Sequence, residues 1–419
     1  MAFTVEDEDK LFEDFLTPGV EEEIRQESKL WDQVDFSDDL EMGGYTFRQK
    51  VRIKTSQAAR ASNVDDYPSA QESTPAEVLG YLKRSMMFAL EFSGFALETA
   101  LKKGTGGAMM APFQFEESGI MITVRDDLSR QLMWDGSGRL CQAKGAGSTS
   151  PTLIVDSPYM KKQPTKFLKE DRVIDAYDPA DDSHDINSIA ISTVDSETQV
   201  TLESNQTWAD DCWIYNEDVW RKTEAAGKGE MMGLLGICSD ADPPTGALQG
   251  LDVSTYPMWK AWVWGNGGTP RPLSEDLLIL AVQKAKKWGN IENMFMLITE
   301  KIERVWISYL RTYKEIDTNI LWGGWHAVPF YYGGKQIPMV PDEYIPDGKI
   351  LGGDKTKLTI YVTQKGKSVT WEKGLYGGGR LRQLEGKNRY AAYGHIFANM
   401  GVSVRKAFFR IDDIQEPDV

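Results

Sequence analysis

Residues 112–138 have the sequence PFQFEESGIMITVRDDLSRQLMWDGSG. Apolar residues recur in it at intervals of seven, four, four and four positions: Phe113, Ile120, Val124, Leu128 and Leu132. This spacing places them on one side of an α-helix about 33 Å long. Pro112 suits the first turn and Gly136 the end, because the first lacks an N–H and the second tolerates a positive φ. The run Ile120–Val124 would also suit a strand, so the pattern predicts a long helix with that alternative open.

The length and composition predict a folded protein of more than one domain. With 419 residues, 41% of them apolar, the chain can build two or more cores. No apolar run approaches the roughly 18–20 residues of a membrane span, and Met1–Asp7 lacks the basic and apolar parts of a secretory signal. The three cysteines form no CxxC pair, which favours a reducing compartment and disfavours a zinc or disulfide framework.

The charge is strongly negative and is uneven along the chain. A formal charge of −16 disfavours a general nucleic-acid binder but is compatible with a local basic face. Acidic clusters fill residues 1–41, so disorder or extension is expected there. Apolar residues are nevertheless frequent in this segment, including Phe12, Phe15 and Trp31. We therefore expect an arm that orders against a partner, with a simple solubility tail as the alternative.

Residues 45–54 alternate between apolar and cationic side chains. The cationic set is Arg48, Lys50, Arg52 and Lys54. Alternation of this kind predicts a strand with one apolar and one cationic face. Residues 56–75 form a long loop without periodicity, and 79–92 form a second apolar run, so an extended hairpin is expected. Gly104–Gly107 lacks the spacing and lysine of a phosphate loop and is interpreted as a hinge.

Two further regions differ in pattern. Short apolar runs broken by polar turns fill residues 152–220, at the spacing of a small barrel or sandwich. His184 lies there among aspartates, and an exposed turn is a better interpretation of it than a metal site. Beyond Gly233 the pattern becomes mixed. The expected elements are helices at 275–288 and 301–313, a buried strand at 295–298, a hairpin at 328–340, and strands at 358–362 and 402–411.

Motifs for catalysis are missing from the sequence. The three histidines lie far from any cysteine, and no GxSxG, HExxH, GxGxxG or GxxxxGK[ST] occurs. Asp135–Gly138 is a turn with no evident partner base. The 13 tryptophans include Trp259, Trp262, Trp264, Trp322 and Trp325. Such residues usually fill cores, but they and the many carboxylates keep open an alternative function, a carbohydrate-active enzyme or a carbohydrate-binding module on the β-rich region.

The order of these parts resembles a tailed-bacteriophage major capsid protein of the Hong Kong 97-type fold. An acidic arm, an extended hairpin, a long helix ending in Arg130–Leu140, a β region and an α/β domain follow one another as in that family. Further stretches carry the likeness: Gly233–Ile237, Leu248–Asp252, Tyr256–Ala261, Gly333–Val340, Ile345–Ile350 and Tyr390–Ile411. It covers about residues 44–414. The β region at 146–226 is large for the family and is similar to an inserted barrel, and the arm before Gly44 matches nothing in it.

The resemblance implies an α+β capsid fold with seven parts. They are an acidic arm (1–43), an extended β-hairpin loop with its hinge (44–108), a spine helix (109–140), a peripheral domain with a barrel-like insertion (141–230), a crossover (231–264), a mixed α/β axial domain (265–387) and a closing segment with the C-terminal tail (388–419).

It also implies a structural role without a catalytic centre, cofactor or metal. Copies of the chain would form hexamers and pentamers in an icosahedral head that encloses double-stranded DNA without sequence-specific binding. Portal, scaffolding or decoration proteins are the other implied partners, and no membrane is. The implied location is the virion capsid, assembled in the host cytoplasm.

The cationic strand face carries a further hypothesis. Like charges at such short spacing repel one another in a lone hairpin. An acidic surface on a neighbouring subunit would compensate them. The candidate acceptors flank the long helix: Glu116, Glu117, Asp126 and Asp127. Phe12, Phe15 and Trp31 of the arm are the candidate apolar contacts with a neighbour.

Overall fold

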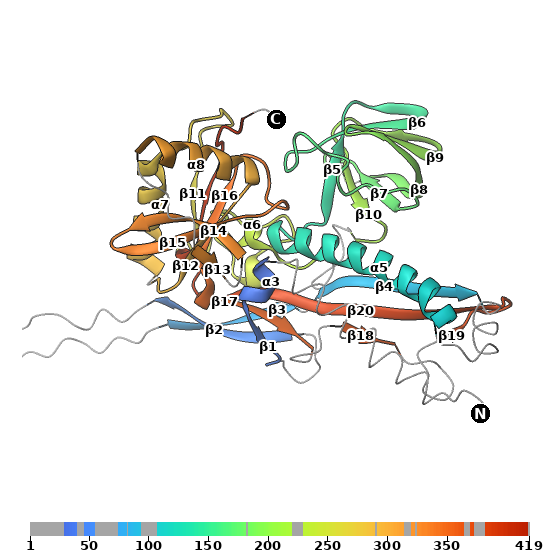
Figure 1. The fold of residues 1–419 in the computed structure, drawn as a ribbon, viewed down its shortest axis with the longest axis horizontal. Helices are drawn as coiled ribbons and strands as arrows, with labels where there is room; N and C mark the ends of the chain where they lie inside the picture. Colours follow the sequence, from blue (N-terminus) through green and yellow to red (C-terminus); the bar gives the residue numbers. More distant parts are fainter. Residues whose placement is uncertain are drawn as a thin grey trace, which may run out of the picture.

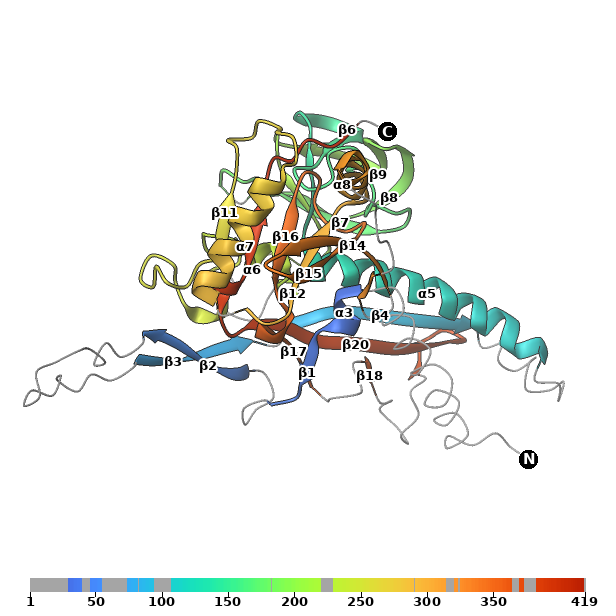
Figure 2. The same cartoon turned by 60° about the vertical axis from the view of Figure 1, so that its left-hand side comes forward.

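The structure is a computed structural model. It describes residues 29–39, 46–54, 74–81, 83–93, 107–181, 183–219, 229–289, 291–313, 320–322, 325–363, 369–372 and 382–417. Figure 1 shows a closed barrel and an α/β domain side by side above a long helix and a sheet of long strands. A hairpin extends from this base in the direction opposite to the long helix, as Figure 2 shows.

The long helix predicted from the apolar stripe is present. It is α5, Gly107–Met133, and it begins five residues before Pro112, which therefore lies in its second turn and not its first. Val124, Leu128 and Leu132 of the stripe are buried. After the helix ends, Gly136 adopts a φ of +73°, as expected of a helix-terminating glycine.

The β region forms a closed barrel with strand order β10-β5-β6-β9-β8-β7. Its strands are β5 Arg139–Ala143, β6 Gly147–Asp156, β7 Val173–Tyr177, β8 His184–Ser196, β9 Gln199–Trp208 and β10 Trp213–Asn216. Its interior is apolar; Leu153, Ile174, Ile191, Val200 and Ile214 are all fully buried. His184 begins β8, where its ring stacks on Tyr177 and its Nε2 lies 3.2 Å from Asp175 Oδ1. It therefore belongs to a strand and not to the expected turn.

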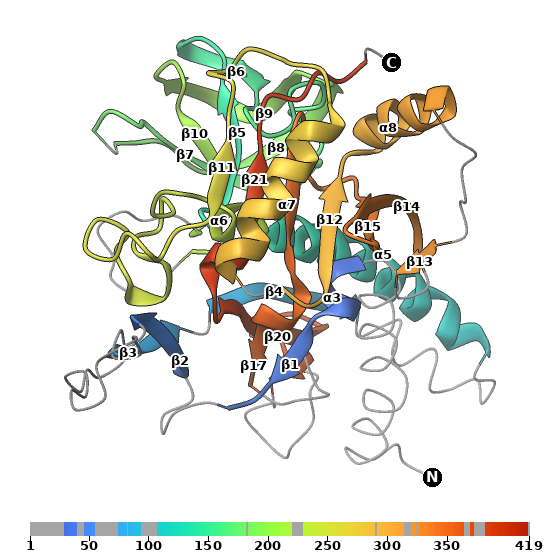
Figure 3. The same cartoon turned by 90° about the vertical axis from the view of Figure 1, so that its left-hand side faces the viewer.

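The α/β domain is built on a seven-stranded sheet of order β11-β21-β16-β12-β15-β14-β13. Its strands are β11 Trp262–Trp264, β12 Met294–Ile298, β13 Ile320–Trp322, β14 Trp325–Tyr332, β15 Lys335–Pro341, β16 Ile350–Asp354 and β21 Phe409–Ile411. Helices α7, Glu275–Gly289, and α8, Glu300–Tyr313, flank it (Figure 3). Ser274 Oγ accepts from Leu277 N–H at 3.4 Å, as expected of an N-cap.

A second sheet of six strands forms the base beneath the long helix. Its strands are β1 Asp35–Ser37, β4 Lys83–Ser93, β17 Leu358–Val362, β18 Val369–Trp371, β19 Arg382–Gln383 and β20 Arg389–Val402. The prediction of a single strand at 402–411 is wrong. Val402 ends β20, a 3₁₀ turn η4 (Arg405–Ala407) follows, and β21 then enters the other sheet. The chain thus turns from one sheet into the other at the buried Arg405.

The predicted hairpin consists of β2, Thr46–Lys54, and β3, Thr74–Tyr81, paired antiparallel. Its return strand begins earlier than expected, and the apolar run at 79–92 divides between β3 and β4. The long strand β4 leaves the hairpin and pairs with β20 from Lys83 to Ser93. The hairpin is thereby joined to the base, because β4 follows β3 in the chain and is hydrogen-bonded to β20.

The remaining short elements join these parts. They are α3 Lys29–Gln33, α6 Leu234–Ile237, η2 Leu248–Gly250 and η3 Lys355–Lys357. Among the described helices, none is long and apolar enough to cross a membrane. Cys141, Cys212 and Cys238 are buried and free.

The expectation of a disordered arm is wrong for residues 29–39. Helix α3 carries Leu30 and Trp31 into the core of the same chain, and β1 pairs in parallel with β17. The Trp31 ring meets Phe36 edge-on at 5.0 Å. Phe12 and Phe15 lie outside the described residues.

Candidate assembly interface

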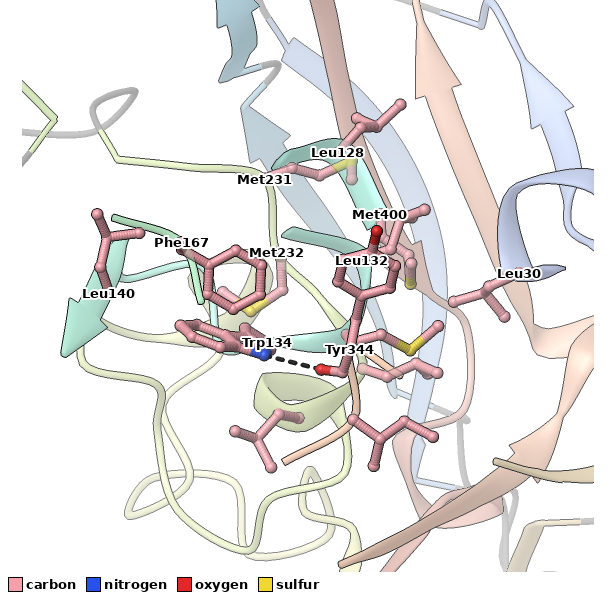
Figure 4. Packing of buried hydrophobic residues seen from close by; sticks show 14 of the residues in the cluster. Leu30, Leu128, Leu132, Trp134, Leu140, Phe167, Met231, Met232, Tyr344 and Met400 are labelled. Carbon is pink, nitrogen blue, oxygen red and sulfur yellow. Dashed lines mark hydrogen bonds between the residues drawn. The ribbon is translucent and has the colours of Figure 1, made fainter. Parts of the chain in front are cut away.

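The end of α5 is the junction of barrel, base and α/β domain. Trp134 follows the helix, is almost fully buried, and donates from Nε1 to the Tyr344 carbonyl at 2.9 Å. Its ring lies 4.7 Å from that of Tyr159 and meets Phe167 edge-on at 5.2 Å. Figure 4 shows Trp134 against Phe167, with its bond to Tyr344 dashed. One side chain therefore contacts both the loop after β6 and the loop after β15.

Asp135–Gly138 is a buried turn, as expected from its sequence. Ser137 donates to Asp135 Oδ1 from its backbone nitrogen at 3.0 Å and from Oγ at 2.6 Å. Tyr159 donates to the other oxygen of Asp135 at 2.8 Å. The Ser137 side chain is fully buried and bound to a carboxylate, so this turn positions the first barrel strand.

A buried ion cluster fixes the same junction. Arg130 is completely buried, bonds to Glu230 through Nη2, and has its Nε 3.7 Å from Asp127. Asp127 is also bound by Arg172 at 3.0 Å. Burial raises the pKa of Glu230 above its usual value, although the neighbouring Arg130 opposes this rise. The cluster joins α5 to the barrel and to the segment that leaves it.

Asp126 is the more exposed of the two aspartates predicted as contacts. It pairs with Lys169 at 3.0 Å and with Arg125 at 3.2 Å, and it accepts from the Tyr344 hydroxyl at 2.9 Å. Burial tends to raise its pKa, but these hydrogen bonds outweigh burial and the pKa lies below its usual value. Asp126 and Asp127 thus have partners in their own chain. Their contact with a neighbouring subunit stays a prediction, as it does for Trp31.

The base of the hairpin is held by buried side chains. Phe47 of β2 is fully buried and stacks on Tyr361 of β17, with ring centres 3.8 Å apart. The side-chain amides of Gln49 and Gln249 meet at 2.8 Å, and Gln249 Oε1 accepts from Val402 N–H at 3.0 Å. These contacts attach β2 to the turn η2 and the end of β20, so they set the direction in which the hairpin extends.

Strand β2 contains all four predicted cationic positions. The pairing with β3 is regular from Thr46 to Arg52, and the register shifts between Arg52 and Lys54. A shift of this kind breaks the alternation of faces. The register shift falls between the third and fourth cationic positions, and the common face of Arg48, Lys50, Arg52 and Lys54 stays a prediction. The side chains of these residues and of Glu116 and Glu117 lie outside the described part of the structure.

The sequence reasoning did not identify Arg405. Its guanidinium is buried and donates to four backbone carbonyls: Gly236, Ile237, Trp259 and Ala241. Burial lowers its pKa to about 10, with the nearby Asp242 acting in the opposite direction. Arg405 therefore fixes the 236–261 segment against η4. No signal in the sequence distinguishes it from an exposed arginine.

Clefts in the described part of the structure do not support a sugar site. Three of them, of about 440, 470 and 340 Å³, have no tryptophan in their walls. Trp259 is buried and donates to the Leu248 carbonyl, while Trp262 and Trp264 pack on the α/β core. Trp322 and Trp325 have no described side chains. No group of histidine, cysteine or carboxylate that could hold a metal occurs among the described residues.

The carboxyl of Asp342 is expected to make the stability of the subunit depend on pH. It lies in the loop after β15, is buried, and accepts from Tyr344 N–H at 2.9 Å. Burial raises its pKa from 3.8 to about 6. The unfolded chain ionises at lower pH than the folded one, so this carboxyl opposes folding increasingly as the pH rises from about 4 to about 6, and fully above that.

Asp342→Asn is therefore expected to raise the free energy of unfolding by about 1–3 kcal/mol at pH 8. Urea unfolding of the unassembled subunit measures the gain, which should shrink as the pH falls towards 4. Asp38→Asn, at an exposed position, is the control and should change little. A gain of equal size at pH 4.5 and pH 8 would contradict the prediction.

The fold matches that of solved capsid structures. The chain aligns with the cyanophage A-1(L) capsid asymmetric unit over 93% of each chain, with a TM-score of 0.52 and 11% identity. Weaker likenesses are the capsid of an empty GTA particle (TM-score 0.44, 11% identity, 93% of this chain and 90% of that one) and the satellite phage P4 procapsid (TM-score 0.41, 10% identity, 96% and 92%). No protein-family model and no curated protein matches the sequence. The chain has a phage capsid fold, and the cyanophage match carries that conclusion.

Proposed function

We propose that the chain is the major capsid protein of a tailed double-stranded DNA phage, with the Hong Kong 97-type variant of the capsid fold. The observation that supports this most strongly is the alignment with the cyanophage capsid over 93% of both chains. At 11% identity the alignment supports the fold alone, and the function is our inference from that fold. The extended hairpin and the long helix agree with a subunit that reaches beyond its own core.

The proposed assembly uses the parts in the order given by the sequence. The loop at 44–108 overlaps a neighbour, the helix within 109–140 is the spine, and 265–387 is the axial domain that meets its copies at five- and six-fold positions. The barrel lies within the peripheral domain, 141–230. Contacts that are weak singly become strong through their number, and rearrangement of the loop and of the arm, 1–43, would lock the shell.

The proposed partners follow from this role. Copies of the chain form hexamers and pentamers, and portal, scaffolding or decoration proteins join them. A net charge of −16 suits a shell whose inner surface does not retain the DNA that it encloses. The role is structural, in the virion capsid, with assembly in the host cytoplasm.

Imaging of the purified protein tests the proposal. Negative-stain micrographs are expected to show closed icosahedral particles, and size-exclusion chromatography a megadalton species. A small, discrete species under the same conditions, with turnover of a carbohydrate, would contradict the capsid role and favour the enzyme alternative.

A further inference from the structure

A cationic and aromatic patch lies at the C-terminal end of α7. Lys406 Nζ is 4.9 Å from the centre of the Trp288 ring and 5.3 Å from that of Trp262. The two indole rings are 6.5 Å apart, and Lys406 also contacts the Met258 sulfur at 3.2 Å. Lys284 lies 5.6 Å from the Trp262 ring, and Lys287 lies 5.8 Å from that of Trp288. These six residues are called the α7 patch below.

The fold brings this patch together from three segments. Helix α7 packs on the turn η4, and Gly289 allows the approach, because a Cβ there would lie 2.4 Å from the Cα of Ala407. The turn thereby places Lys406 over the two tryptophans. Strand β11 supplies Trp262, and the loop before it supplies Met258. Figure 3 shows α7 lying across the sheet beside β11 and β21.

The patch has no complement among the described residues. Trp288 and Met258 are each 48% exposed, although large apolar side chains are usually covered. None of the three lysines has a carboxylate within ion-pair distance in the described part of the chain. Burial and the neighbouring Lys260 lower the pKa of Lys406, the direction expected for an ammonium group without an acidic partner. The exposed Trp288 ring, the exposed Met258 and the lysines together define a surface for an acidic ligand that also carries apolar side chains.

Residues 1–28 of the same chain have that chemistry. They contain two basic residues and ten acidic ones: Glu6, Asp7, Glu8, Asp9, Glu13, Asp14, Glu21, Glu22, Glu23 and Glu27. Phe12 and Phe15 lie between the acidic clusters. An extended segment of this length reaches up to about 90 Å, and it joins the described chain at Lys29, where α3 begins.

We propose that residues 1–28 bind the α7 patch, with their carboxylates against Lys284, Lys287 and Lys406 and with Phe12 or Phe15 against Trp288 and Met258. The proposal rests on the capsid role, because the binding is placed in the assembled particle. It gives the arm a receptor of defined residues.

Photo-crosslinking tests this binding. Phe12 is replaced by p-benzoylphenylalanine in the full chain, the particles are irradiated, and crosslinked peptides are identified by mass spectrometry. Crosslinks are expected in peptides that contain residues 256–262, 284–288 or 404–408. Particles built from mixed isotopically light and heavy chains show whether the segment comes from the same copy or from a neighbour, and either result supports the proposal.

A charge reversal makes the test specific. Lys284→Glu with Lys406→Glu is expected to lower the crosslink yield at least about tenfold, a difference of 1.4 kcal/mol in binding. Lys161→Glu with Lys387→Glu changes the charge equally at two exposed lysines outside the patch and should leave the yield unchanged. If the first double variant does not assemble, Lys284→Gln with Lys406→Gln replaces it.

The outcomes separate this inference from the proposed function. Particles whose crosslinks fall outside the patch, or reach packaged DNA, would overturn the inference and leave the capsid role standing. Equal losses in the two double variants would overturn it as well. If the unaltered chain forms no particles, both proposals fail.

Discussion

Replacing Arg130 by methionine is expected to lower the free energy of unfolding of the subunit by about 3–5 kcal/mol. Arg130 is fully buried, and its closest partner, Glu230, is buried with it. Removing the guanidinium leaves the Glu230 carboxylate uncompensated in a place that water does not reach. Asp127 suffers less, because Arg172 still binds it.

Urea unfolding followed by tryptophan fluorescence measures the loss in the unassembled subunit. Arg125→Met is the matched control, since the Arg125–Asp126 pair is partly exposed and should contribute roughly 0–1 kcal/mol. Adding Glu230→Met to Arg130→Met removes both charges and should recover most of the stability. An Arg130→Met variant within about 1 kcal/mol of the unaltered chain, or a double variant no better than the single one, would show that the pair does not hold the junction.

Features with a strong local period could be predicted from the sequence. The apolar stripe of α5, the alternation in β2 and the capped helix α7 each repeat often enough to be recognised within one segment. The short, turn-bounded runs of the β region likewise indicated a small barrel or a sandwich, and the structure has a closed barrel.

The buried charges could not be predicted in this way. Residues 127–134 of α5 and its end are buried on every side, because the barrel covers one face and the α/β domain another. An amphipathic pattern indicates a single covering layer, so it does not predict a buried Arg130. Its closest partner, Glu230, lies a hundred residues away in the sequence, where no local pattern points to it.

Long-range pairing explains the error in the arm. Strand β1 pairs with β17, more than 300 residues later in the sequence, and Trp31 is buried through that docking. Local composition favoured disorder, because acidic residues dominate the segment. The contact that orders it depends on residues that no local pattern connects to it.

Reversing two charges on the hairpin is expected to block assembly while leaving the subunit folded. The variant is Arg48→Glu with Arg52→Glu. The pairing of β2 with β3 places Arg48 opposite Leu79 and Arg52 opposite Pro75, whereas Lys50 is opposite Glu77. Reversing Arg48 and Arg52 therefore leaves the oppositely charged cross-strand pair of Lys50 and Glu77 unchanged. Loss of assembly then reports on a contact outside the hairpin.

The loss is measured as the fraction of protein that elutes as particles, with circular dichroism to check the fold. Lys161→Glu with Lys387→Glu carries the same change in net charge at two exposed lysines elsewhere and should assemble normally. Each exposed pair contributes only about 0–1 kcal/mol, but the contact recurs at every copy, so small terms add up. High salt limits the attraction between exposed charges to distances of about 10 Å or less. It should therefore loosen preformed particles of the unaltered chain.

The acceptor of these charges can be identified by restoring the attraction. Asp127 is enclosed by Arg130 and Arg172, and Asp126 is bound by Lys169, so neither offers a free carboxylate to a neighbour. Glu116 and Glu117 are the members of the predicted set that remain to be tested. Adding Glu116→Arg and Glu117→Arg to the hairpin double variant reverses both sides of the contact and is expected to restore particles. Normal particles from the hairpin variant alone would show that this face makes no essential contact, and failure of the fourfold variant would move the acceptor to another acidic surface.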